Sequence, residues 1–136
     1  MSTLRVPLEG SLYYRGREGQ WAYLLHRITG LGTLLFLTIH ILDTSTVYFF
    51  PDLYQHAIAI YRATPFMLGE IALVFAVIYH GVNGLRIALF DLFPSWWQTD
   101  RQRTSFWWVV GLSVLLWLPA AFLMGRSLVV NNLLGG

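Results

Sequence analysis

One histidine, His80, lies midway along an apolar stretch and has small residues on its face of the expected helix. Ala76 and Gly84 stand four residues before and after it, and Gly81 is its immediate neighbour. A flat porphyrin approaches a helix closely only where side chains are small, and neutral imidazole is a common axial ligand of haem iron. The same small residues are typical of close helix packing in membranes. Two interpretations stay open, a haem ligand and a histidine hydrogen-bonded to a neighbouring helix.

A second set of polar side chains lies along an earlier apolar stretch, from His26 to His40. These two histidines are 14 residues apart, so on one helix they point within about 40° of each other with a rise of about 21 Å. The same stripe also carries Thr29, Thr33, Asp43 and Thr44. Ionisable groups that face lipid are costly, so we expect this stripe to face other helices or a cofactor. For His26 and the adjacent Arg27, interfacial contact with lipid phosphates is the alternative.

His40 and His80 are not expected to bind one haem between them. His40 lies about 27 Å from the N-terminal start of its expected helix, and His80 lies about 18 Å from the C-terminal end of its own. Because these two helix ends lie on the same side of the membrane, the histidines differ in depth by about 9 Å. We therefore expect two haem levels, each completed by a partner chain. Asp43 is expected to accept the ring N–H of His40; the alternative is a His40–Asp43 pair bonded only to a neighbouring helix.

These residues must be positioned by membrane-spanning helices, because the composition excludes most other folds. Of the 136 residues, 56% are hydrophobic and 12% are charged, and the mean hydropathy is +0.55. Soluble domains have about 45–50% apolar and about 25% charged residues. Three stretches reach the length of about 20 residues that a bilayer requires, and they cover about residues 22–48, 66–93 and 106–128. The sequence predicts an all-α integral membrane protein, with three transmembrane helices in a single domain (residues 1–136).

The placement of arginine predicts the orientation, since all nine basic residues are arginine. Seven lie at one side of the expected membrane, namely Arg5, Arg15, Arg17, Arg27, Arg86, Arg101 and Arg103. Only Arg62 and Arg126 lie at the other side. An excess of basic residues marks the cytoplasmic side, so we expect a cytoplasmic N-terminus. The isoelectric point is near 9.2, but the arginines form no basic face, and we expect no nucleic-acid partner.

Two short signatures resemble those of a known family. The segment Trp21-Ala-Tyr-Leu-Leu-His26-Arg27-Ile-Thr29-Gly30 resembles a His-Arg-x-[Ser/Thr]-Gly signature that opens a first helix. Tyr79-His80-Gly-Val-Asn-Gly84-Leu-Arg86, followed by Asp91, resembles a His-x-x-x-Gly-[Ile/Leu]-Arg…Asp signature that closes a second helix. Both are typical of the cytochrome b membrane-anchor subunit of succinate dehydrogenase, respiratory complex II. The lead-in Tyr13–Gly19 and the run His40–Thr44 are similar to the actinobacterial-type branch.

The resemblance implies a role for each matched residue. His80, with Gly84 in the same signature, matches the axial ligand of haem b, whose second axial histidine comes from a partner anchor subunit. Arg27 matches an arginine near the quinone and a haem propionate, and His26 matches its neighbour in that region. His40 suits the first-helix ligand of members with two haems. Tyr23 stands where many members have a serine that contacts quinone, so the tyrosine hydroxyl is the expected contact.

The resemblance also implies a place in a larger complex of the bacterial inner (cytoplasmic) membrane. A flavoprotein subunit oxidises succinate, an iron–sulfur subunit carries the electrons, and this chain, with a second membrane-anchor subunit and surrounding lipid, delivers them to quinone. The alternative function is a haem-free structural membrane anchor, in which the histidines and arginines contact neighbouring helices or quinone only. The residues do not distinguish ubiquinone from menaquinone.

Overall fold

The computed structural model describes residues 17–96, 98–130 and 134. Arg5, Arg15 and the Tyr13–Gly16 part of the lead-in lie outside these residues. The element order is α2 (Arg17–Phe49), α3 (Pro51–Tyr61), α4 (Thr64–Leu92), a short 3₁₀ turn η1 (Pro94–Trp96) and α5 (Thr99–Leu128). The three long helices are long and apolar enough to cross a membrane, which confirms the predicted all-α membrane architecture.

The helix ends extend beyond the apolar stretches in a way that their residues explain. Both α2 and α5 begin several residues before the expected positions, with Glu18 and Asp100 in their first turns. Acidic side chains stabilise the N-terminal end of a helix dipole, and Pro65 lies at the start of α4, where its missing N–H costs no hydrogen bond. Hydropathy marks only the part of a helix that suits hydrocarbon, so it underestimates helices that continue into polar sequence.

The connection between the first two spans contains a helix that the sequence analysis did not predict. Residues 51–61 form α3, which has Pro51 in its first turn together with Asp52. Proline at the first helical position and an early acidic residue are recognised start signals. The eleven residues of α3 are too few to cross a bilayer, so this helix connects the two spans at one end of the molecule.

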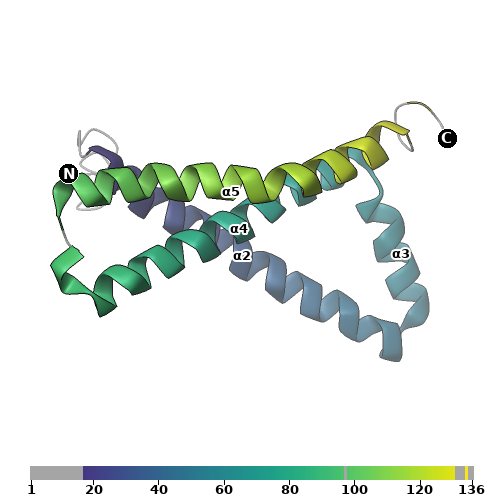
Figure 1. Cartoon of the computed structure of the whole chain (residues 1–136). Helices are drawn as coiled ribbons and strands as arrows, with labels where there is room; N and C mark the ends of the chain where they lie inside the picture. The colour runs from purple at the N-terminus through teal and green to yellow at the C-terminus, as the bar shows by residue number, and fades with distance from the viewer. Residues whose placement is uncertain (1–16, 97, 131–133, 135–136) are drawn as a thin grey trace, which may run out of the picture.

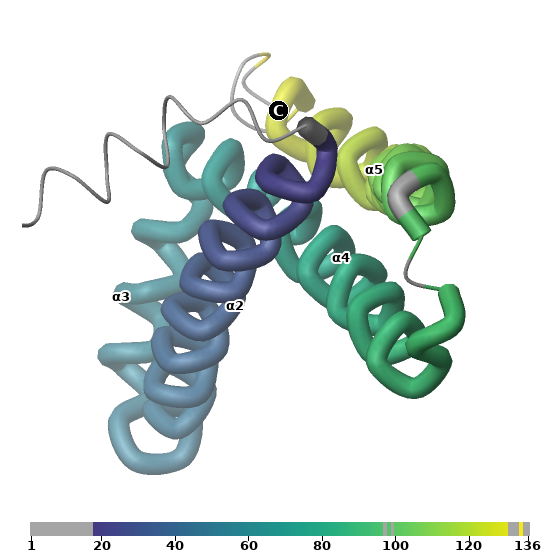
Figure 2. Tube along the Cα trace, turned by 90° about the vertical axis from the view of Figure 1, so that its left-hand side faces the viewer, coloured from purple at the N-terminus to yellow at the C-terminus, as the bar shows by residue number. Residues whose placement is uncertain are grey.

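The three long helices come together where α2 crosses α4, near the middle of both helices (Figure 1). Figure 1 shows α2 and α4 crossing, with α5 along α4, and α3 closing a triangle with the second half of α2 and the start of α4. The view in Figure 2, turned by 90°, also shows the second half of α2 leading away from α4 and α5. We call the end with the starts of α2 and α5 and the end of α4 the proximal end, and the opposite end the distal end.

Few side chains of the described residues are buried, and most of those lie on α4 and α5. The buried apolar residues of the described chain are Ala22, Tyr79, Phe90, Phe106, Val109 and Leu128. Three polar residues, Thr29, Asn83 and Ser113, are buried with them. Most large apolar side chains on the three helices face outward. A chain with so little core of its own has to face lipid or other subunits.

Candidate functional site

His80 and His26 form an interhelical pair where α4 crosses α2. Their rings are stacked, with centroids 4.1 Å apart and planes inclined by 9°. The Nδ1 atom of His80 lies 3.1 Å from the backbone carbonyl oxygen of His26. Since a carbonyl only accepts, Nδ1 carries the proton and donates this hydrogen bond. The two signature motifs are therefore brought together at one point of the bundle.

Two glycines make this crossing possible, one on each helix. A Cβ atom at Gly30 would lie 2.7 Å from Cε1 of His80, and a Cβ at Gly84 would lie 3.6 Å from Cε1 of His26. Each histidine ring thus fits against the glycine of the facing helix. Gly84, one of the small residues beside His80, is therefore used for contact between helices. Gly30, the glycine of the first signature, makes an even tighter contact of the same kind.

The hydrogen bond of His80 determines which of its nitrogens can bind a metal. With the proton on Nδ1, the lone pair is on Nε2. Within the described part of the chain, Nε2 of His80 makes no hydrogen bond. It is also not one of the buried side-chain atoms that lack a hydrogen-bond partner. Metal-binding histidines usually donate their other ring N–H to a carbonyl or carboxylate, which fixes the ring orientation. The donor set at His80 therefore fits an axial haem ligand.

The described residues contain no group of three or more His, Cys, Asp or Glu side chains that could hold a metal ion. This does not bear on haem, because an axial position requires one imidazole from this chain and porphyrin supplies the other four nitrogens. Parallel rings 4.1 Å apart do not present two nitrogens to opposite sides of one iron, so the two histidines of this pair do not ligate one haem together.

Arg27 and Tyr23 lie together on the outward surface of α2. Nη1 of Arg27 donates a 2.6 Å hydrogen bond to the hydroxyl oxygen of Tyr23, and the guanidinium carbon lies 5.3 Å from the centre of the tyrosine ring. Both side chains are exposed. A guanidinium and a phenol held in one place can bind a carbonyl or an anionic oxygen, and the outward position means that a neighbouring subunit must complete any such pocket.

The groove between α2 and α5 does not include this pair. It has a volume of about 660 Å³ and is lined by Glu18, Trp21, Leu25, Arg103, Phe106, Trp107 and Val110. Positions two residues apart point about 200° away from each other on a helix, so Trp21 and Leu25 lie on the face of α2 opposite Tyr23. The groove and the Arg27–Tyr23 pair are thus separate features of the proximal end.

His40 lies far from the paired histidines, on the part of α2 that leaves the bundle. It is ten residues beyond Gly30, which is about 15 Å along the helix, whereas Gly30 touches His80. His40 is therefore separated from His80 along α2, and the two haem levels stay a prediction. The imidazole of His40 is exposed and stacks on Phe36, with ring centroids 5.4 Å apart.

The expected hydrogen bond from His40 to Asp43 is not formed. The carboxylate of Asp43 instead accepts a short hydrogen bond from the hydroxyl of Tyr61, at the end of α3. This bond raises the pKa of Tyr61, and partial burial and the charges of Asp43 and Glu70 act in the same direction. The sequence analysis missed Tyr61 because its partner lies 18 residues away, in a segment taken as a connection without a helix.

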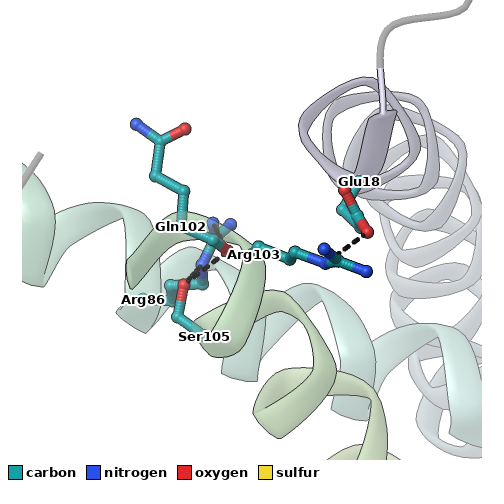
Figure 3. Close-up of polar contacts among 5 residues, drawn as sticks. All are labelled: Glu18, Arg86, Gln102, Arg103 and Ser105. Atoms are coloured by element: carbon teal, nitrogen blue, oxygen red, sulfur yellow. Dashed lines mark hydrogen bonds and ion pairs between the residues drawn. The ribbon is translucent and has the colours of Figure 1, made fainter. Parts of the chain in front are cut away.

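The proximal end also contains a polar network that the sequence analysis did not assign. Figure 3 shows Arg86 of α4 at the start of α5, where its Nε donates to Oγ of Ser105 at 2.7 Å and its Nη2 donates to the carbonyl of Gln102 at 3.1 Å. A third contact joins Nη1 to Oδ1 of Asn83 at 3.3 Å. An ion pair of 2.9 Å between Arg103 and Glu18 links α5 to α2 (Figure 3). Arg86 therefore has a structural role in tying α4 to α5.

Comparison with known proteins agrees with this architecture. Residues 8–120 match the family model described as succinate dehydrogenase/fumarate reductase transmembrane subunit. The chain is also 34% identical, over 113 residues, to the succinate dehydrogenase 2 membrane subunit SdhC of Mycobacterium tuberculosis (strain ATCC 25618 / H37Rv). That match covers 82% of this chain and 81% of the mycobacterial protein.

Proposed function

Because the chain belongs to the succinate dehydrogenase/fumarate reductase transmembrane subunit family, we propose that it anchors such a complex in the membrane, binds haem b and forms part of the quinone site. The family places a multi-pass membrane subunit in an enzyme complex whose succinate chemistry lies on other chains. The observation that carries the haem part is the hydrogen bond from Nδ1 of His80 to the carbonyl of His26. This bond leaves Nε2 free and holds the ring in one orientation.

His80 is the axial ligand in this proposal, and bound haem supplies a one-electron relay. The contribution of the chain is to hold the imidazole still. The stack on His26 fixes the plane of the ring, and Gly30 allows the close approach of α2. The second axial histidine comes from the partner anchor subunit. His40, about 15 Å farther along α2, is the proposed ligand of a second haem, also completed by a partner.

Arg27 and Tyr23 are the proposed contacts of the quinone head, and His26, which directly precedes Arg27 on α2, is the third residue assigned to the quinone site. Quinone reduction builds negative charge on the quinone oxygens, which a guanidinium stabilises by charge-assisted hydrogen bonds. The bond to Tyr23 orients the guanidinium before the substrate arrives, so less side-chain freedom is lost on binding. The exposure of both residues is consistent with a pocket whose other wall belongs to the iron–sulfur or second anchor subunit.

The proposed setting is the inner membrane of a bacterium, with the proximal end in the cytoplasm. The flavoprotein and iron–sulfur subunits then dock at that end, next to Arg27 and the start of α5. Five arginines of the described residues lie on this side, as the positive-inside rule requires, namely Arg17, Arg27, Arg86, Arg101 and Arg103.

Optical spectra of the purified complex test the haem assignment directly. Replacing His80 by Leu should remove a low-spin b-type signal from the reduced-minus-oxidised spectrum. His56→Leu is the matched control, since His56 is exposed on α3 and should leave the spectrum unchanged. An assembled His80→Leu complex with the haem content of the wild type would exclude this ligand.

Activity with two electron acceptors tests the quinone assignment. Arg27→Leu should lower quinone reduction while succinate oxidation with a soluble artificial acceptor is retained. Arg101→Leu is the control, because Arg101 is also exposed near the proximal end but lies on α5. Haem content must be measured in the same samples, since a propionate contact would also involve Arg27. Equal loss with both acceptors, or no loss, contradicts the assignment.

A haem-free structural anchor is the second candidate. The observation that favours it is that the His80 ring is already bound within the chain, by the stack on His26 and the hydrogen bond to its carbonyl. A pyridine haemochrome assay on the purified complex separates the two functions, because the structural anchor predicts no haem on this subunit.

A further inference from the structure

The groove between α2 and α5, of about 660 Å³, takes no part in the proposed haem and quinone sites. Its lining changes in the same order on both helices. On α2 the lining runs from Glu18 to Trp21 and then to Leu25. On α5 it runs from Arg103 through aromatic residues to Val110. Each side of the groove therefore begins with a charged residue near the start of its helix and continues with apolar residues, which is the polarity of a molecule with a charged head and an apolar tail.

Two tryptophans indicate the depth of the groove in the membrane. Trp21 and Trp107 are 61% and 58% exposed, whereas Phe106, which also lines the groove, is only 6% exposed. Tryptophan is enriched where hydrocarbon meets the polar headgroups, so we expect the charged mouth at the level of the headgroups. From Arg103 to Val110 the lining extends about 10 Å along α5, within the roughly 15 Å of hydrocarbon in one leaflet. The groove thus suits the upper part of one acyl chain.

The mouth of the groove is formed by two opposite charges. Nε of Arg103 lies 2.9 Å from Oε1 of Glu18 (Figure 3), and the two side chains are 65% and 21% exposed. A guanidinium has five N–H donors and a carboxylate has about four acceptor sites. One contact through Nε therefore leaves donors on Arg103 and acceptors on Glu18 for a ligand. Arginine binds phosphate and a carboxylate binds ammonium by charge-assisted hydrogen bonds.

We propose that this groove binds one phospholipid whose headgroup joins a phosphate to a primary ammonium, as in phosphatidylethanolamine. The phosphate binds Arg103, the ammonium binds Glu18, and one acyl chain lies along Phe106 toward Val110. A zwitterionic headgroup suits the mouth because the two protein charges there sum to zero. An anionic headgroup offers Glu18 no cation, and its net negative charge is repelled by the carboxylate. A choline headgroup has no N–H to donate to Glu18.

This inference goes beyond the proposed function and does not depend on it. The groove lies on the face of α2 opposite Tyr23, so the lipid does not occupy the place proposed for the quinone head. It also requires no haem, since none of its residues belongs to the histidine pair. The His80 and Arg27 variants can therefore fail their own tests while the lipid site is retained, and the reverse also holds.

Lipid binding to the purified, delipidated complex tests the headgroup contacts. Native mass spectrometry is used with phosphatidylethanolamine, phosphatidylglycerol and phosphatidylcholine of identical acyl chains. The wild type should bind one phosphatidylethanolamine about tenfold more tightly than the other two lipids, the effect of one hydrogen bond between charged groups. Arg103→Gln should lose that tight binding. Arg101→Gln is the matched control, because Arg101 is exposed on α5 but does not line this groove. Equal binding of the three lipids, or equal loss in both variants, overturns the proposal.

Glu18→Gln is the most selective variant, because it changes the charge of the mouth and not its shape. The ammonium loses its partner and the mouth becomes cationic, so the preference should shift by about tenfold from phosphatidylethanolamine toward phosphatidylglycerol. If the ion pair only holds α2 against α5, the variant weakens all three lipids equally or none of them. Either of these results overturns the proposal.

Two further measurements decide the case if the charge variants do not assemble. Val110→Trp fills the groove below an intact ion pair and should also lose the tightly bound lipid; binding equal to the wild type contradicts the proposal. A density map of the wild-type complex in phosphatidylethanolamine nanodiscs should show a headgroup at Arg103 and Glu18, with one chain along Phe106. A protein segment or a quinone tail in the groove, or an empty groove, overturns the proposal.

Discussion

The two ends of this bundle differ in whether their polar side chains are paired with a facing helix of the same chain. At the proximal end the histidine pair, Arg86 and the ion pair of Arg103 all find partners on a facing helix of the same chain. At the distal end α4 and α5 stay joined through the bond from Trp117 to Ile71, but α2 leaves them (Figure 1). There His40 is exposed, and the link back to α4 runs through Asp43, Tyr61 and the helix α3.

This difference indicates at which end the polar side chains pair mostly within this chain and at which end they need another subunit or a cofactor. Polar side chains inside a membrane are costly unless they are paired. The proximal end satisfies most of that demand internally, so its geometry can be tested by changes within this chain. The exposed stripe around His40 does not satisfy it, so we predict that a partner subunit or a cofactor covers the second half of α2.

The largest effect at the proximal end is expected when a single methyl group is added at Gly30. In Gly30→Ala the new Cβ would lie 2.7 Å from the His80 ring, which cannot give way easily because it is stacked and hydrogen-bonded. We expect α2 and α4 to separate locally, at a cost of about 1–3 kcal/mol, and the b-type signal of His80 to be lost or shifted. Gly32→Ala is the matched control, since no atom lies within 4 Å of a Cβ there. Equal spectra for both variants would mean that the crossing does not position His80.

The same comparison predicts a selective effect for His40. If His40 binds a second haem at the distal end, the complex has two b-type potentials, and His40→Leu should abolish one while the His80 signal is retained. The separation of about 15 Å along α2 is the reason for independence. Redox titration of the wild-type and variant complexes measures both components. A single haem per complex, unchanged by His40→Leu, would leave His40 as a contact for a partner helix.

A smaller effect is expected from the link between α4 and α5. Ser105→Ala removes the acceptor of the Nε–H of Arg86, which is then left unpaired in a half-buried position. The expected loss of stability is about 1–3 kcal/mol, measured by thermal unfolding of the purified complex. Ser45→Ala serves as the control, because its exposed hydroxyl bonds only to a carbonyl of its own helix. A loss no greater than that of the control would show that Arg86 finds another partner.

The smallest effect concerns the distal link and depends on pH. The hydrogen bond to Asp43 raises the pKa of Tyr61, so the bond stabilises the folded state only while the phenol keeps its proton. That contribution is fully present below the ordinary tyrosine pKa of about 10 and is lost as pH rises through the raised value. Tyr61→Phe should lower the melting temperature slightly at pH 8, and the gap to the wild type should close at strongly alkaline pH. A gap that stays constant with pH would contradict the assignment.

The sequence predicts a helix of this fold reliably only where a long apolar run marks it. The three spans were predicted because a bilayer requires about 20 apolar residues in succession, and α2, α4 and α5 contain them. The helix α3 was not predicted, although Pro51 and Asp52 mark its start, because the signal for a span is a run of about 20 apolar residues and α3 has only eleven residues. The orientation and the ligand roles of His80 and His40 stay predictions.

The candidate site shows the same division at the level of single residues. The sequence by itself determined that His26, Arg27 and His80 are unusual, because ionisable side chains stand out within apolar helices. Only the tertiary structure decided the partner of His80, which donates to the carbonyl of His26 across the helix crossing. Likewise Asp43 pairs with Tyr61 and not with His40. The bond of Arg27 to Tyr23 lies within α2, between positions four residues apart, so helix spacing alone brings these two side chains together. Periodicity fixes which face of a helix a residue occupies, but the point at which two helices cross depends on packing along their whole length.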